Sequence, residues 1–305
     1  MKIFKIIIIN LVIFFIIFIS VETYYAKKWK VSSFKQYANV IFNTISVDEY
    51  YEKLFKNQYI EENNASINSF RSDMNTDSTL KPILFMGCSF TYGDGIEQNE
   101  TISYRTAILT GRPTYNRAGR GWGLGQFLYM ARNNYIYNNI PEPEYLVYLY
   151  IDDHMNRLDR FKVEPGCIDF QPKYKVFKNG LIEEKPHFYD RIFFIADFQY
   201  NYNFRFHKIT DEIVKLYFNE AEKEIHKHWK NTKLVILIYP IERDEDQNNR
   251  ELWKELKKEN YYKIINIKDL TDIDLTSDKY KVDGWHPSAK VWDIIYPDII
   301  KKILE

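Results

Sequence analysis

The stretch ILFMGCSFTYG, from Ile83 to Gly93, decides the fold of this 305-residue chain. Its first four residues are apolar, and a glycine, a thiol and a hydroxyl follow them directly. A short apolar run of this kind is typical of a strand that is covered on both faces of a parallel sheet. Gly87 and Gly93 would relieve a tight turn from that strand into a helix. Ser89 is therefore expected just beyond the carboxyl end of a buried strand, where open α/β sheets bind their ligands.

Similar apolar runs recur after Lys81, with helix-length segments between them. The runs are TYN (114–116), YLVYLYI (145–151), KLVILIYP (233–240) and YKIINI (262–267), and a helix is predicted over 210–231. This alternation predicts an α/β fold, a doubly wound parallel sheet between two helical layers. The segment 158–208 is a long insertion with an Asn179-Gly180 hairpin signal, and we interpret it as a lid or wall over the site.

The N-terminus is the clearest signal of organisation. From Ile3 to Val21 only one lysine and one asparagine interrupt apolar or small residues, which is close to the ~20 residues that a membrane helix needs. We predict an uncleaved transmembrane anchor over 1–24 and an extracytoplasmic soluble part. A cleaved signal peptide and a buried helix are the alternatives, and basic residues on both flanks weaken the charge asymmetry that sets orientation. Residues 25–80 are predicted to be a spacer with a helix over 47–63, followed by the main domain over 81–305.

Composition excludes several functional classes. The 42 basic and 42 acidic side chains balance, and no basic block suggests a nucleic-acid partner. The cysteines, Cys88 and Cys167, could form at most one disulfide, and we interpret both as free thiols. His226 and His228 would point in different directions on a helix and so do not suggest a metal site. No metal or organic cofactor is expected.

A second motif lies near the other end of the chain, where Asp283 precedes His286 by three residues. A serine hydroxyl becomes a good nucleophile when a histidine removes its proton, and that histidine needs an acceptor that fixes its tautomer. Ser89, His286 and Asp283 are therefore predicted to form a catalytic triad. The alternative is that Asp283 or Ser288 caps a helix and His286 lies on the surface.

These residues resemble the SGNH, or GDSL-like, hydrolase superfamily, whose first block is a Gly-Asp-Ser variant and whose last is Asp-x-x-His. The run from Asn116 to Gly123 is similar to the Asn-x-Gly-x-x-Gly of its second block. The resemblance covers about residues 81–305. It implies a flavodoxin-like SGNH fold, an acyl-enzyme on Ser89, and an oxyanion hole built from the N–H groups of Ser89 and Gly121.

The first and third blocks depart from the family pattern. Cys88 replaces the usual aspartate, and alternation along the chain would send its side chain away from that of Ser89 into the interior. Asp152 occupies the place of a third-block asparagine that would donate to the oxyanion, and an ionised carboxylate there would repel it.

Three interpretations of Asp152 remain open. Burial protonates it, or it points away and binds Arg157 or a substrate hydroxyl, or another donor such as His154 or Asn156 replaces it. We favour the second interpretation. Asp153 belongs to the same third-block region.

The resemblance suggests a serine esterase that hydrolyses an O-acyl ester, with an acetylated envelope glycan as the first substrate to test. Trp122 and Trp285 flank site residues and could stack on a sugar ring. Expected partners are an acylated small molecule or glycan and the membrane, but not nucleic acid. A glycan O-acetyltransferase, a non-catalytic glycan-binding protein and a lipid esterase are the alternatives.

Overall fold

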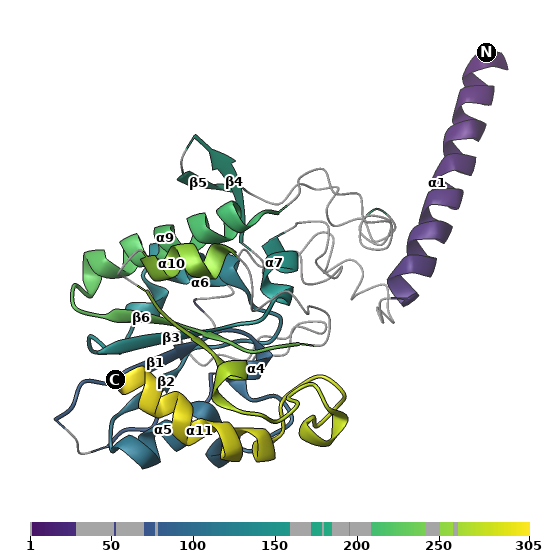
Figure 1. The fold of residues 1–305 in the computed structure, drawn as a ribbon. Helices are drawn as coiled ribbons and strands as arrows, with labels where there is room; N and C mark the ends of the chain where they lie inside the picture. The colour runs from purple at the N-terminus through teal and green to yellow at the C-terminus, as the bar shows by residue number, and fades with distance from the viewer. Residues whose placement is uncertain are drawn as a thin grey trace.

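The computed structural model of the chain describes residues 2–28, 52, 70–76, 79–158, 172–178, 180–184, 195, 209–241, 251–258 and 262–305. Its first element is the helix α1, Lys2–Lys28, drawn in purple in Figure 1. From Ile7 to Tyr25 this helix is long and apolar enough to cross a membrane, a property that signal sequences share. Its apolar side chains are exposed; that of Phe14, for example, is 61% exposed. A helix that is apolar on all faces fits hydrocarbon better than water.

Five strands form a parallel central sheet. They are β1 (Ile83–Met86), β2 (Thr114–Asn116), β3 (Tyr145–Tyr150), β6 (Lys233–Ile238) and β7 (Tyr262–Asn266). Their order is β2-β1-β3-β6-β7, and every neighbouring pair is parallel. The second strand of the chain lies on one side of β1 and all later strands lie on the other, as in flavodoxin-like sheets. The predicted doubly wound α/β fold is confirmed, and each predicted strand is present.

Helices cover both faces of the sheet, as Figure 1 shows. One layer contains α6 (Leu124–Arg132), α9 (Asp211–His228) and α10 (Glu251–Lys258), and the other contains α5 (Ile102–Thr110) and α11 (Ala289–Leu304). Shorter elements are α4 (Ser89–Tyr92), α7 (Asp153–Leu158) and 3₁₀ turns at Gln98–Glu100, Tyr135–Tyr137, Ile267–Leu270 and Asp278–Tyr280. The helix predicted over 210–231 begins after its N-cap residue Thr210 and ends at His228.

Alternation along the strands divides the core in two. Leu84, Leu146 and Leu234 pack beneath α6, α9 and α10, whereas Ile83, Val147 and Val235 pack beneath α11. Successive side chains of a strand point to opposite faces, so strands that are apolar at every position need a helical layer on each side. The carboxyl ends of β1 and β3 are thereby held in a rigid layer.

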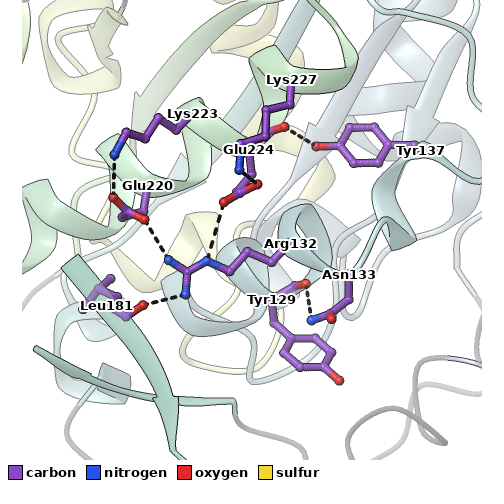
Figure 2. Close-up of polar contacts among 9 residues, drawn as sticks. All are labelled: Tyr129, Arg132, Asn133, Tyr137, Leu181, Glu220, Lys223, Glu224 and Lys227. Atoms are coloured by element: carbon purple, nitrogen blue, oxygen red, sulfur yellow. Dashed lines mark hydrogen bonds and ion pairs between the residues drawn. The ribbon is translucent and has the colours of Figure 1, made fainter. Parts of the chain in front are cut away.

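A two-stranded hairpin, β4 (Lys173–Phe177) and β5 (Gly180–Glu184), lies beside α9. The hairpin prediction is confirmed, but Gly180 pairs with Phe177 and so begins a strand instead of lying in the turn. Figure 2 shows how Arg132 holds the hairpin: its guanidinium donates to the Leu181 carbonyl at 2.8 Å and to Glu220 at 2.8 Å. Apart from residues 158, 172, 178 and 195, the rest of the predicted insertion lies outside the described residues, including Cys167 and nearly all of its aromatic-rich part.

The end of the predicted spacer packs on the sheet. Met74 and Thr114 exchange backbone hydrogen bonds of 3.0 and 2.9 Å, and Arg117 forms a bidentate ion pair with Asp73. Residues 70–76 therefore contact the sheet of the domain predicted over 81–305. Of the helix predicted over 47–63, residue 52 alone lies within the described residues.

Candidate active site

Ser89 is the first residue of α4, directly after the sharp turn that follows β1. Gly87 has a φ of +146°, and a Cβ there would lie 2.4 Å from Thr91 Oγ1 and 2.9 Å from the Leu149 carbonyl oxygen. Glycine is thus required for the turn to pass so close to the neighbouring strand. Cys88 is a free, fully buried thiol in the core, as expected, whereas Ser89 points to the sheet edge.

The loop before α11 is closed at its base by backbone hydrogen bonds. The N–H of Val282 donates to the His286 carbonyl at 3.0 Å, and the N–H of Ser288 donates to the Tyr280 carbonyl at 2.8 Å. Inside the loop, Asp283 Oδ1 accepts the N–H of His286 at 2.9 Å. A short side chain bonded to backbone two or three residues ahead gives a fixed local turn. The Asp-x-x-His spacing therefore presents both side chains on one rigid loop.

The two turns meet across the end of the sheet. His286 Nε2 lies 2.9 Å from Ser89 Oγ, and His286 Nδ1 lies 2.6 Å from Asp283 Oδ2. Both distances are within hydrogen-bond range. The imidazole also packs against Phe90, with ring centroids 5.4 Å apart. The structure thus joins the three predicted side chains in one continuous chain of hydrogen bonds.

The environment of Asp283 favours its charged form. Partial burial raises the pKa of this carboxyl, but hydrogen bonds from the backbone and imidazole of His286 and from the backbone of Trp285 outweigh it and lower the pKa below its ordinary value. An ionised Asp283 can hold the Nδ1 proton of His286, which leaves Nε2 free to accept a proton from Ser89.

Gly121 lies in a turn after β2. The turn is closed by the Trp122 N–H, which donates to the Gly119 carbonyl at 3.2 Å, and Gly121 has a φ of +69°. The N–H of Gly119 in turn donates to the Gly87 carbonyl at 3.2 Å. This bond places the glycine-rich turn directly beside the Ser89 turn.

Asn116 is fully buried at the end of β2. Its amide donates to the Thr91 carbonyl at 2.9 Å and to Ser103 Oγ at 3.2 Å, and its oxygen accepts the Ala118 N–H at 3.2 Å. The buried Asn116 side chain therefore joins α4 to the loop after β2. It does not line an open site.

The third-block residues take different positions. Asp152 is 2% exposed, and the ion pair of Arg157 is with its neighbour Asp153. His154 is completely buried, with Nδ1 3.0 Å from the Tyr148 hydroxyl, and burial lowers its pKa well below the usual range. His154 is therefore a neutral ring in the core. It does not fit the role of a donor to the oxyanion in place of the third-block asparagine.

The two tryptophans also differ in position. Trp122 is 4% exposed and packs edge-on against Phe70, so the expectation that it offers a sugar platform is wrong. Trp285 is 55% exposed and lies directly between Asp283 and His286 in the sequence.

The sequence did not predict a set of hydrogen bonds that supports the Ser89 turn. Arg71, from the predicted spacer, donates to the carbonyls of Tyr92, Gly93 and Ile96, at and just after the end of the short helix α4. Nothing in the local sequence of Arg71 indicates this contact, because its acceptors are backbone atoms more than twenty positions away.

Comparisons with known proteins find similarity in solved structures alone. No protein-family model matches the sequence, and no curated protein matches it significantly. A lipolytic protein of the G-D-S-L family from Veillonella parvula DSM 2008 has 12% identity and a TM-score of 0.43, covering 73% of this chain and 96% of that chain. A family two carbohydrate esterase from Clostridium thermocellum, solved in complex with cellohexaose, has 12% identity and a TM-score of 0.44, covering 75% of this chain and 66% of that chain. Solved structures to which this chain is similar thus include G-D-S-L lipolytic proteins and a carbohydrate esterase.

Proposed function

We propose that this chain is a serine esterase that hydrolyses an O-acyl ester through an acyl-enzyme on Ser89. The observation that carries the proposal is the hydrogen-bonded chain from Ser89 Oγ through the imidazole of His286 to Asp283. A serine at 2.9 Å from a histidine nitrogen is within reach of a general base. The ionised carboxylate behind the ring stabilises the imidazolium that forms.

In the first half-reaction, Ser89 Oγ attacks the ester carbonyl carbon while His286 Nε2 takes the serine proton. The carbonyl oxygen becomes an oxyanion, and the N–H groups of Ser89 and Gly121 donate to it. The bond to the leaving alcohol then breaks, and His286 returns its proton to that alcohol. Ser89 is left as an acyl ester.

In the second half-reaction, water attacks the acyl ester while His286 takes one of its protons. Collapse of the tetrahedral intermediate breaks the bond to Ser89 Oγ, which recovers its proton from His286. The products are a carboxylic acid and the free serine. A sugar hydroxyl in place of water would make the same site an O-acetyltransferase.

The substrate class that we propose is an acetylated glycan of the cell envelope. Exposed Trp285, in the Asp283–His286 loop, offers an aromatic face on which a sugar ring can stack. The apolar helix α1 would keep the domain at a membrane surface, near envelope polymers. The carbonyl carbon of a sugar acetate would then lie within reach of Ser89 Oγ while the sugar ring contacts Trp285.

The test uses the full chain purified in detergent, a short-chain chromogenic ester and a serine-directed phosphonate. We expect turnover of the ester, and mass spectrometry should find the phosphonate on Ser89. The Ser89→Ala variant should bind no label and show background turnover. Label on another residue, or unchanged turnover by Ser89→Ala, would refute the proposal.

A second experiment tests the substrate class and separates hydrolase from transferase. Acetylated polysaccharide is supplied with and without an unacetylated oligosaccharide, and acetate is followed in water and on the acceptor. Release to water supports the esterase, whereas acetyl groups on the added acceptor support the transferase. Trp285→Ala should raise KM for the polysaccharide and leave KM for the small ester unchanged; equal effects on both would exclude Trp285 as a sugar platform.

A further inference from the structure

Arg157 links the helix after β3 to the glycine-rich loop after β2, which lies beside the Ser89 turn. It lies on α7, and its side chain is only 18% exposed. Its guanidinium donates to Asp153 Oδ2 through Nε at 3.0 Å and Nη2 at 2.7 Å, and through Nη1 to the Trp122 carbonyl. Its charge also acts on the buried thiol of Cys88 and opposes the rise in the pKa of this thiol that burial causes. One side chain therefore ties the ends of β2 and β3 together, and its charge lies near the end of β1.

Two neighbours of this guanidinium, Cys88 and Trp122, are each one residue away from a group of the proposed mechanism. Cys88 precedes Ser89, and Trp122 follows Gly121. A shift of either neighbour would move the nucleophile relative to the N–H that receives the oxyanion.

The close packing around Arg157 supports a fixed position. A Cβ on Gly123 would lie 3.4 Å from Arg157 Cβ and 3.5 Å from its Cδ, so the second-block loop rests directly on this side chain. The guanidinium is a rigid, planar fork that donates to a carboxylate and a carbonyl in fixed directions, and the single ammonium of a lysine does not reproduce this geometry. A largely buried charge is retained only where such acceptors are fixed around it.

We propose that Arg157 is a positioning residue, which sets the distance between the Ser89 turn and the Gly121 turn without touching the substrate. This inference rests on the proposed function. The resemblance to the third block of the SGNH hydrolases does not imply this role for Arg157. The expected consequence is an effect on the chemical step with little effect on substrate binding.

The test compares Arg157→Ala and Arg157→Lys with Arg132→Ala in the full chain. Arg132 is a matched control, because it is 20% exposed and also joins a carbonyl to carboxylates, but at the hairpin (Figure 2). We expect kcat for the chromogenic ester to fall about 10- to 100-fold in both Arg157 variants, with KM within about twofold, since small displacements of reacting groups cost this much. Arg132→Ala should lower thermal stability and keep kcat.

Rescue distinguishes positioning from general destabilisation. Millimolar guanidinium should restore part of kcat in Arg157→Ala and none in Ser89→Ala. Wild-type kcat in folded Arg157→Lys and Arg157→Ala would overturn the inference. If Arg157→Ala does not fold, wild-type kcat in Arg157→Lys is sufficient to overturn it, and a reduced kcat with unchanged KM supports it. The proposed function is judged separately, by the residue that the phosphonate labels and by the turnover of Ser89→Ala.

Discussion

Ser89 Oγ and His286 Nε2 lie 2.9 Å apart, although 197 positions separate them in the chain. The parallel sheet brings them together: one follows the first strand and the other precedes the last helix, and both loops end at the same edge. Neither side chain can do the proposed chemistry alone. The effects on kcat of replacing Ser89 and of replacing His286 should therefore depend on each other.

We first predict that Ser89→Ala and His286→Gln each reduce kcat by about 10⁴-fold or more, and that the double variant is no worse than either single one. Triad members act as a unit, so that removing a second one costs little. Steady-state kinetics on the small ester measure this, with circular dichroism as the control for folding. If the fold reductions in kcat of the two single variants multiply in the double variant, the two residues act independently.

The second prediction separates the backbone strain of Gly121 from its role in the site. Gly121 and Gly111 have φ values of +69° and +65°, and a Cβ at either meets nothing within 4 Å. Alanine at either position should cost about 1–2 kcal/mol of stability, because both must adopt a left-handed conformation. Only Gly121→Ala should also lower kcat. Denaturant unfolding and kinetics on both variants test this, and a wild-type kcat in Gly121→Ala would mean that the turn accepts the methyl group without moving the N–H of residue 121.

The third prediction concerns the charge of Asp283. Asparagine can still accept the backbone N–H groups of Trp285 and His286, but its amide would stabilise the wrong tautomer of the imidazole. Asp283→Asn should lower kcat about 10⁴-fold with little change in the melting temperature. Asp278→Asn is the control, because Asp278 lies in the same region and its side chain is 94% exposed. An active Asp283→Asn variant would mean that His286 is oriented by other contacts.

The elements that the sequence predicted well are those in which chemistry and periodicity agree. Strands that are apolar at every position require cover on both faces, and this requirement determines the layers. The Asp-x-x-His motif is equally local, since the backbone bonds to Asp283 arise within three residues. A prediction from these features needs no knowledge of distant contacts.

The sequence was a poorer guide where a side chain had a choice of partners. Arg157 could reach Asp152 or Asp153, and the helical i to i+4 spacing favours Asp153, which the favoured interpretation of Asp152 overlooked. Trp122 follows a glycine-rich turn that looks exposed, yet Phe70 from the spacer covers it. Arg71 likewise binds backbone carbonyls, which carry no sequence signal. These contacts all depend on how separate segments pack.

The last prediction concerns pH and His154. Burial, and to a smaller extent the charge of Arg157, lowers the pKa of His154 well below its ordinary value, so the folded protein keeps this ring neutral. The unfolded chain takes up a proton as the pH falls below about 6.5. Stability from this group is therefore complete above that pH and is lost below it, by about 1.4 kcal/mol between about pH 7.5 and about pH 5.5. The His154→Phe variant loses the hydrogen bond to Tyr148, so its stability is lower at every pH, but it should lack this extra pH dependence.

Urea unfolding of the wild type and His154→Phe across this pH range measures the difference in the slope of stability against pH. His228→Phe is the control, because His228 is exposed. Parallel curves for the wild type and His154→Phe would mean that the ring is protonated to the same extent in the folded and unfolded chains.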